Sequence, residues 1–317
     1  MTATQKDKPK VLVVTKIPPD LREALSAEYE LTDYPVDAAT ARSFPPAPGY
    51  RIAVTMVYAG ANADLMKALP DVRLIASGGV GLDRIDLKEA GRRGIAVTHT
   101  PDELTEDTAD TAIGMIFGVS RRMVEADRYV RSGGWLKGHL SESRSISGKK
   151  VGIVGLGKIG SSIARKAACL GMSVMYTGPR AKPGAPYEFC DSTAALAEKV
   201  DVLILSCPGG EATRNMVGVA ELEALGKNGI LINLSRGTVV DEPALIDALT
   251  NGAIAGAGLD VFASEPNIDQ RFMALENVVL QPHYAAITHE MRAATTQRLC
   301  SEIRKFVASA PFLNVAK

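Results

Sequence analysis

The side chains best suited to proton transfer are a histidine and a glutamate in the last third of the chain. His283, one of four histidines, ends the run Leu280-Gln281-Pro282-His283. Glu265 lies in Ser264-Glu265-Pro266, five residues after Asp260. An imidazole titrates near neutral pH, so it can give a proton to a developing alkoxide. A nearby carboxylate can orient it and favour its charged form. The two residues therefore suggest an acid–base pair.

An arginine and an aspartate complete this set. Arg236 lies in Asn233-Leu234-Ser235-Arg236-Gly237, and Asp260 in Gly258-Leu259-Asp260-Val261, each after an apolar run. Open α/β sheets bind ligands at the carboxyl ends of their strands, where these side chains are expected. A guanidinium there can bind a carboxylate and polarise a keto oxygen. Singly, such an arginine is often a surface ion pair and a Pro-His step a loop. Together the residues predict reduction of a 2-keto acid.

Reduction requires a hydride donor, and Val151–Gly160 (VGIVGLGKIG) predicts its binding site. Gly155 permits a tight turn, Gly157 lets the backbone approach a pyrophosphate, and Gly160 lets helix and strand pack closely. The following helix offers N–H groups and a positive dipole end to phosphates. The alternative is an ordinary glycine-rich turn between a strand and a helix.

The next strand, predicted over 173–176, indicates which dinucleotide binds. A site for NAD places an acidic residue at this strand end, to bind the ribose hydroxyl. Here the chain continues Thr177-Gly178-Pro179-Arg180-Ala181-Lys182, with no acid until Glu188. Arg180 can pair with a 2′-phosphate that a carboxylate would repel, and Thr177 and Lys182 can assist. We therefore expect NADPH rather than NADH, although both basic residues could instead be solvated loop charges.

Strands and helices alternate along most of the chain, as in βαβ units with a parallel sheet. The first series has predicted strands at 10–15, 51–55, 72–77 and 95–98, with helices at 21–29, 63–69 and 87–91. The second has strands at 151–154, 173–176, 201–205, 229–233, 255–260 and 278–280, with helices at 159–170, 192–198, 219–224 and 242–250. One long helix over about 105–132, ended by Gly133-Gly134, and a last helix over 288–309 are also expected.

This pattern predicts an α/β fold of two doubly wound parallel-sheet, Rossmann-like domains, with the active site in the cleft between them. The last helix is too short to be a domain, so we expect it to pack on the first series. Residues 1–100 and 288–317 would then form a discontinuous substrate domain, and residues 101–287 an NADP-binding domain.

Composition argues against several other classes of protein. The 317 residues hold 36 Lys+Arg and 36 Asp+Glu, which gives no electrostatic case for nucleic acid or a membrane as partner. The four cysteines form no CxxC pair and no cluster with histidine, so neither a metal site nor a disulfide framework is expected. The polar start MTATQKDKPK lacks the apolar core of a signal peptide, and no apolar run reaches 18 residues. We expect a soluble, cytoplasmic protein.

Taken together, the motifs resemble the D-isomer-specific 2-hydroxyacid dehydrogenases over almost the whole chain. The segments that carry the resemblance are Gly79–Asp86 (GVGLDRID), Thr100–Asp110 (TPDELTEDTAD), Val151–Gly160, Ile232–Asp241 (INLSRGTVVD), Ala257–Pro266 (AGLDVFASEP) and Val278–His283 (VVLQPH). Within the family the chain looks most like the glyoxylate/hydroxypyruvate reductase branch, partly through Tyr176–Arg180.

The resemblance implies roles for particular residues. Arg236 would bind substrate, with Glu265 and His283 as the catalytic pair, and the backbone of Val80 and Gly81 would hold the substrate carboxylate. Asp260 would contact the nicotinamide carboxamide, Thr108 would lie beside the nicotinamide or its phosphates, and Cys207-Pro208 would border the ribose. The full set of expected cofactor contacts is Thr108, Gly155, Leu156, Gly157, Lys158, Ile159, Gly160, Thr177, Gly178, Arg180, Cys207, Pro208, Thr213, Leu234, Ser235, Asp260, His283 and Ala285.

Assembly and substrate are also suggested by the resemblance. Trp135 lies in the stretch that reaches the partner subunit of a homodimer in relatives. After the histidine the family usually has a Gly-Ser-Ala/Thr type of sequence, whereas this chain has Tyr284-Ala285-Ala286-Ile287, which leaves the cofactor contact and the substrate size open. The expected activity is NADPH-dependent reduction of glyoxylate and hydroxypyruvate. The alternatives are reduction of hydroxyphenylpyruvate or another bulky 2-keto acid, with Met56, Val57 and Tyr284 around the pocket, and a dinucleotide-responsive corepressor module.

Overall fold

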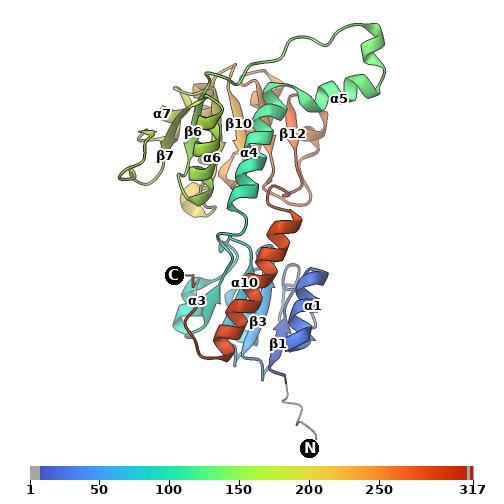
Figure 1. Ribbon diagram of the computed structural model, residues 1–317, viewed down its shortest axis with the longest axis vertical. Helices are drawn as coiled ribbons and strands as arrows, with labels where there is room; N and C mark the ends of the chain where they lie inside the picture. Colours follow the sequence, from blue (N-terminus) through green and yellow to red (C-terminus); the bar gives the residue numbers. More distant parts are fainter. Residues whose placement is uncertain (1–7, 313–314, 317) are drawn as a thin grey trace, which may run out of the picture. The chain divides into compact units, whose positions relative to one another are not determined.

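The computed structural model describes residues 8–312 and 315–316, and the chain forms two compact units (Figure 1). Unit 1 comprises Met1–Leu104 and Ile287–Lys317, and unit 2 comprises Thr105–Ala286. Each unit is built on one sheet whose strands all pair in parallel, with helices against it. The predicted α/β fold with parallel sheets is thus confirmed.

Within the described residues, unit 1 holds a five-stranded sheet of order β2-β1-β3-β4-β5. Its strands are β1 (Lys10–Val13), β2 (Glu30–Asp33), β3 (Ile52–Met56), β4 (Leu74–Gly78) and β5 (Ala96–Thr98). Its helices are α1 (Pro19–Glu28), α2 (Ala63–Ala68), α3 (Leu87–Arg92) and α10 (His289–Val307). Apolar residues of β1, β3 and β4 are buried on both faces, as expected for parallel strands covered by helices.

The two faces of this sheet carry separate apolar clusters. One face packs on α2 and α3, and the other packs on α1 and α10. Leu299, Cys300 and Ile303 of α10 join Leu21 and Leu25 of α1 in the second cluster. Figure 1 shows α10 lying along the sheet of unit 1. The final helix therefore belongs to the core of the unit that begins the chain.

In unit 2, whose residues are all described, seven strands have the order β12-β11-β10-β9-β6-β7-β8. They are β6 (Lys150–Val154), β7 (Ser173–Thr177), β8 (Glu188–Phe189), β9 (Val202–Leu205), β10 (Ile230–Asn233), β11 (Gly256–Leu259) and β12 (Val278–Leu280). The α-helices are α4 (Thr105–Ser120), α5 (Met123–Arg131), α6 (Lys158–Cys169), α7 (Thr193–Ala197), α8 (Val219–Leu225) and α9 (Glu242–Thr250). Short 3-10 turns are η1 (Gly134–Lys137), η2 (Glu211–Thr213), η3 (Gly237–Val239) and η4 (Gln270–Ala274).

Successive side chains of the unit 2 strands pack on opposite faces of the sheet. Ile230 and Ile232 of β10 pack with α4 and α6, whereas Leu231 packs on the other face with α8 and α9. The strand order changes direction at the neighbours β6 and β9, because the chain proceeds outward through β7 and β8 and then returns to β9. In such sheets ligands bind beyond the carboxyl ends of the strands at this switch point. A ligand site is therefore expected at the loops after β6 and β9.

The prediction of one continuous helix over about 105–132 is wrong, because this stretch is divided into α4 and α5. Arg122, between them, has the left-handed backbone angle φ of 50°, which a continuous helix cannot contain. Its guanidinium donates to the carboxylate of Glu125 and to the carbonyl of Ser141, so the turn is held by side-chain bonds. Figure 1 shows α5 and the chain after it extending away from the sheet of unit 2.

Two edge strands were not predicted. β2 (ELTD) is polar and only partly buried, and β8 has two residues, so neither shows the apolar run that marks a central strand. Each pairs on one side only, β2 with β1 and β8 with β7. Across the described chain, no helix has both the length and the apolar character needed to cross a bilayer.

Candidate active site

The glycine-rich turn after β6 is closely packed on two sides. Gly155 has φ of +94°, and a Cβ atom there would lie 2.8 Å from the Cα of Cys207 in the loop after β9. A Cβ atom on Gly160 would lie 2.1 Å from the carbonyl oxygen of Gly155. The side chain of Ser206 also donates to that oxygen, at 2.8 Å. The turn therefore requires glycine at both positions to bring α6 against β6 and β9.

The middle glycine of the motif lies in different surroundings. Gly157 caps the N-terminus of α6 without a side-chain bond, and a Cβ atom there would meet nothing within 4 Å. Lys158 and Gly157 are both exposed. The open backbone at a helix N-terminus fits the pyrophosphate of a dinucleotide, which needs close N–H donors and no intervening side chain.

The two basic residues after β7, Arg180 and Lys182, differ in their contacts. Lys182 donates from its ammonium group to the carbonyl of Leu156, and its backbone N–H donates to the hydroxyl of Tyr176 at 2.7 Å. Arg180 is exposed and makes no hydrogen bond or ion pair with any other described residue. Thr177 is buried, and its carbonyl accepts from the N–H of Gly155 at 2.9 Å. The end of β7 is thus tied to the glycine turn, with an available guanidinium next to it.

The loop after β9 borders the same turn. Cys207 is partly buried, and burial raises the pKa of its thiol. Thr213 closes the loop, because its hydroxyl donates to the carbonyl of Pro208 at 2.8 Å. These three predicted cofactor residues therefore form one braced segment beside Gly155.

Arg236 follows β10 in a loop held by Asn233. The side-chain oxygen of Asn233 accepts from the N–H of Ser235 at 3.0 Å and from its hydroxyl at 2.7 Å. The side-chain nitrogen of Asn233 donates to the carbonyl of Arg236 at 3.1 Å. Sequence reasoning assigned no role to Asn233, although asparagine before a loop is known to hold such turns through its side chain. Arg236 itself donates to the carbonyl of Ser235 at 2.7 Å.

His283 and Glu265 form the expected pair. Nδ1 of His283 lies 2.8 Å from Oε2 of Glu265, and Oε1 of Glu265 accepts from the N–H of Phe262 at 2.9 Å. Burial by itself raises the pKa of Glu265, but the His283 bond, the Phe262 N–H and the charge of Arg236 outweigh it and hold this pKa below its ordinary value. The carboxylate therefore stays ionised near neutral pH and accepts the Nδ1 proton, which leaves Nε2 for a reactant.

Asp260 holds the backbone that carries the histidine. Its Oδ1 accepts from the N–H groups of Tyr284 at 2.6 Å and Ala285 at 3.1 Å, and its carbonyl accepts from the N–H of His283 at 2.8 Å. His283 has φ of +53°, a left-handed conformation uncommon outside glycine. Burial raises the pKa of Asp260, against the opposing effect of the two N–H donors. The carboxylate expected at the carboxamide thus already binds the main chain of this loop.

The remaining predicted residues of unit 2 lie around this loop. Ala285 is buried, and its carbonyl accepts from the hydroxyl of Thr111 at 2.9 Å, which joins the loop to α4. Thr108 is buried in the first turn of α4, and Leu234 is buried after β10. Unit 2 therefore gathers Arg236, Asp260, Glu265 and His283 at the carboxyl ends of β10, β11 and β12 and the loops that follow.

Val80 and Gly81 belong to unit 1, after β4. The N–H of Gly79 donates to the hydroxyl of Thr100 at 2.9 Å, the N–H of Thr100 donates back to the carbonyl of Gly79 at 3.0 Å, and Nδ1 of His99 lies 3.2 Å from the carbonyl of Val80. No backbone hydrogen bond among the described residues uses the N–H of Val80 or Gly81. His99 and Thr100 were not predicted to shape this turn, since their contact is visible only once β4 and β5 are paired.

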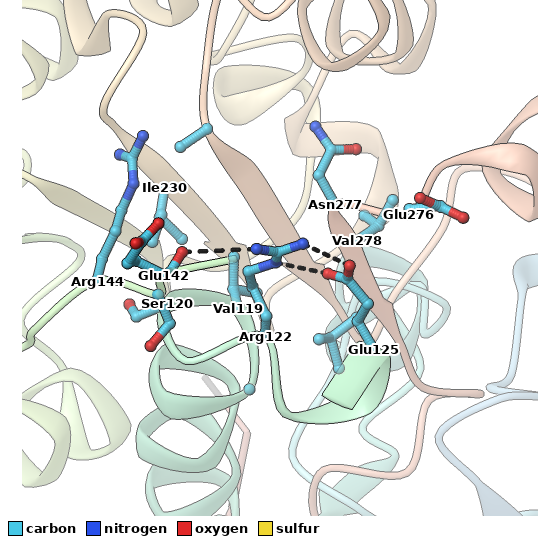
Figure 2. A pocket seen from close by; sticks show the side chains of 14 residues that line it. Val119, Ser120, Arg122, Glu125, Glu142, Arg144, Ile230, Glu276, Asn277 and Val278 are labelled. Atoms are coloured by element: carbon cyan, nitrogen blue, oxygen red, sulfur yellow. Dashed lines mark hydrogen bonds and ion pairs between the residues drawn. The ribbon is translucent and has the colours of Figure 1, made fainter. Parts of the chain in front are cut away.

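A cavity of about 400 Å³ in unit 2 lies elsewhere (Figure 2). Its lining includes Ile230 and Val278, the first residues of β10 and β12, so it lies at the strand ends opposite to the predicted set. Figure 2 shows Arg122 bound to Glu125 inside it, with the Nε–Oε2 distance 2.6 Å. None of the predicted site residues lines this cavity. We assign it no part in the chemistry.

Residues 113–285 match the family model for the NAD-binding domain of D-isomer-specific 2-hydroxyacid dehydrogenases. The chain belongs to this family. The match covers the glycine turn and every strand of unit 2, so unit 2 is its nicotinamide-dinucleotide-binding domain.

Individual relatives of this family member include two plant reductases. The chain is 46% identical to glyoxylate/hydroxypyruvate reductase A from Arabidopsis thaliana, over 77% of this chain and 78% of that protein. It is 41% identical to hydroxyphenylpyruvate reductase from Plectranthus scutellarioides, over 80% and 82%.

A solved structure is similar over nearly the full length. It is an NADPH-dependent glyoxylate/hydroxypyruvate reductase from Sinorhizobium meliloti in complex with NADP and malonate, at 36% identity and a TM-score of 0.88, covering 98% of this chain and 97% of that one.

Proposed function

We propose that this dehydrogenase reduces small 2-keto acids, with glyoxylate and hydroxypyruvate as the preferred substrates and NADPH as the reductant. The observation that carries the proposal is the Glu265–His283 pair at 2.8 Å, at the same sheet edge as Arg236. Unit 1 would serve as the substrate domain and unit 2 as the cofactor domain. The resemblance to the Arabidopsis and Sinorhizobium reductases supports this choice of substrates.

In this proposal each residue has a defined role. Arg236 binds the substrate carboxylate and polarises the keto oxygen, while the N–H groups of Val80 and Gly81 hold the carboxylate from unit 1. A reduced nicotinamide, when bound, supplies the hydride. His283 gives the Nε2 proton to the oxygen that becomes the hydroxyl, and Glu265 keeps Nδ1 protonated and the ring oriented throughout. His283 regains its proton from solvent after the product leaves.

The proposed preference for NADPH rests on the end of β7. Arg180 is exposed and has no partner among the described residues, and no acidic residue lies between the end of β7 and Glu188. A guanidinium there stabilises a 2′-phosphate, whereas a carboxylate would repel it. Lys182, already bound to the carbonyl of Leu156, adds positive charge beside the turn.

Tyr284 gives a specific reason to test a second substrate class. It follows His283, and 54% of its surface is exposed. An aromatic side chain beside the proton donor suits a bulky aryl keto acid, and one relative is a hydroxyphenylpyruvate reductase. The loop after β12 thus supports hydroxyphenylpyruvate as the alternative substrate.

One panel of assays tests these proposals. Oxidation of NADPH and NADH is measured with glyoxylate, hydroxypyruvate and hydroxyphenylpyruvate. We expect the highest kcat/KM for the two small acids with NADPH. A preference for hydroxyphenylpyruvate would select the alternative, and no turnover with any keto acid would instead favour the dinucleotide-responsive binding module.

The cofactor proposal has its own variant. Arg180→Asp should lower kcat/KM for NADPH by about 10²-fold and leave that for NADH nearly unchanged, because the new carboxylate repels only the 2′-phosphate. Arg42→Asp, the same charge change on an exposed residue of unit 1, serves as control. An unchanged ratio between the two cofactors would contradict the assignment of Arg180.

We also propose that the protein is a homodimer in the cytoplasm. Apolar side chains gather on α5 and η1 without covering a core: Met123 is 55% exposed, Val130 55%, Trp135 63% and Leu136 94%. Contiguous exposed apolar residues are typical of protein–protein interfaces. The expected cytoplasmic location stays a prediction.

A further inference from the structure

Gly209, in the loop after β9, lies against the stem of Arg236. A Cβ atom built on Gly209 would be 2.5 Å from Cγ of Arg236 and 3.1 Å from its Cβ. Carbon atoms in contact prefer about 3.5–4.0 Å, so no side chain fits between them. The backbone of residue 209 therefore forms a wall on which the proposed substrate-binding arginine rests.

The backbone of neither partner in this contact can easily move away. On the Gly209 side, the hydroxyl of Thr213 donates to the carbonyls of Pro208 at 2.8 Å and Gly210 at 3.2 Å, the two residues that flank the glycine. This bracing fixes the loop on both sides of the contact.

The arginine is braced in the same way. Its carbonyl accepts from Asn233, and its Nη1 donates to the carbonyl of Ser235. The next residue, Gly237, already packs against the loop after β11, because a Cβ atom there would lie 1.9 Å from the carbonyl carbon of Phe262. The loop after β10 therefore has no room to move toward the loop after β11. A methyl group at position 209 must consequently be relieved by rotation about the side-chain bonds of Arg236, which moves its guanidinium.

We propose that Gly209 is a positioning residue for the reduction: its missing side chain sets where the Arg236 guanidinium lies. This inference rests on the proposed function, in which Arg236 binds the keto acid. Bidentate binding of a carboxylate depends on the placement of the planar guanidinium, and a displacement of about 1 Å can cost about 10²-fold in rate. Gly209 was not singled out from the sequence, because a Pro-Gly-Gly turn alone gives no hint of which side chain lies over it.

The test compares Gly209→Ala with a matched glycine. Gly114, inside α4, has open space within 4 Å of the position that a methyl group would take, so Gly114→Ala should remain within about twofold of the wild type. Gly209→Ala should lower kcat/KM for glyoxylate by about 10²-fold, chiefly through a higher KM for the keto acid. The dissociation constant for NADPH, measured by fluorescence, and the melting temperature should stay unchanged.

A double variant isolates the contact itself. In an Arg236→Ala background the stem is gone, so adding Gly209→Ala should cause no further loss of kcat/KM. If Gly209→Ala alone fails to fold, the double variant should fold again, since the contact has been removed. Equal losses in both backgrounds, a weaker NADPH affinity, or a near-normal single variant would each overturn the role of Gly209. Failure of the proposed function is recognised separately, by a wild-type enzyme that reduces no keto acid.

Discussion

At the scale of single residues, the proposed acid–base pair depends on a backbone conformation as much as on its side chains. His283 adopts φ of +53°, and its N–H and the two that follow are bound by Asp260. A strained residue persists only where its surroundings hold it. Asp260 thus fixes the direction of the imidazole, while Glu265 fixes its rotation and its Nδ1 proton.

Removal of the imidazole should remove the chemical step and little else. His283→Ala should lower kcat by about 10²–10⁴-fold, because proton donation to the alkoxide is lost. NADPH binding, followed by fluorescence titration, should be nearly unchanged. Glu265→Gln should reduce kcat less, because the imidazole remains but has lost its ionised partner.

His289→Ala is the matched control, since His289 is an exposed residue at the start of α10 in unit 1. It should retain wild-type kinetics. Near-normal turnover by His283→Ala would remove the basis for assigning proton donation to this side chain.

Functional residues can be predicted from the sequence when the residue type itself indicates the chemistry. Arg236, Glu265 and His283 are charged or titratable side chains after apolar runs, and the fold places all three at the predicted sheet edge. Thr100 and Gly209 escape such reasoning because their importance comes from a neighbour far away in the chain. Hydrogen bonds and contacts of that kind become visible only when strand order is known.

At the scale of elements, the glycines of the turn after β6 have different roles: Gly160 allows close packing, and Gly157 leaves space for a ligand. A methyl group on Gly160 would lie 2.1 Å from the carbonyl oxygen of Gly155, so Gly160→Ala should reduce the free energy of unfolding by about 1–3 kcal/mol and weaken NADPH binding. Gly157→Ala meets open space, so it should unfold like the wild type yet bind NADPH more weakly. Chemical denaturation and fluorescence titration measure the two effects. Equal destabilisation by both variants would refute this division.

The first turn of α4 is joined by ion pairs to the C-terminal half of α6. Glu106 of α4 accepts from Ser162 at 2.8 Å and from Arg165 at 2.9 Å, and it lies 2.9 Å from Nζ of Lys166. The Lys166 bond, followed by those of Ser162 and Arg165, lowers the pKa of Glu106 to about 2. The group remains largely exposed, so solvent screening limits its contribution to about 1 kcal/mol.

This ion pair predicts a pH dependence of stability. The native pKa lies below the ordinary value of 4.5, so the stabilisation is complete above about pH 4.5 and disappears as the pH falls toward 2. Thermal unfolding of wild type and Glu106→Gln should therefore differ most at neutral pH and converge in acid. A difference that grows as the pH falls would contradict the assigned direction.

Some element boundaries and edge strands could not be predicted from sequence patterns. The helices and central strands were predicted because their apolar residues recur at regular spacing. The break between α4 and α5 was missed because Arg121-Arg122 contains neither glycine nor proline, and the turn depends on bonds from Arg122 to Glu125 and Ser141. Likewise β2 is a strand through its pairing with β1 rather than through its own composition.

At the scale of the whole molecule, α5 and η1 set the expected assembly. Leu136→Glu places a charge on the most exposed apolar residue of this surface, and burial of an unpaired charge opposes association. We expect a shift from dimer to monomer, measured by light scattering after size-exclusion chromatography. Met273→Glu, at an exposed apolar residue of η4, should leave the dimer intact. A wild type that is already monomeric would refute the proposed interface.

The place of α10 has a consequence for synthesis of the chain. Unit 2 is one continuous stretch, so its core is complete once Ala286 has been made. The sheet of unit 1 is made first, yet the apolar cluster around Val11, Val13 and Val54, to which α1 already contributes, is completed only when Leu299 and Ile303 arrive. At about 5–20 residues per second, translation of unit 2 delays this step by roughly 10–40 seconds. During that interval unit 1 exposes the part of this sheet face that α10 later covers, and chaperones can bind there.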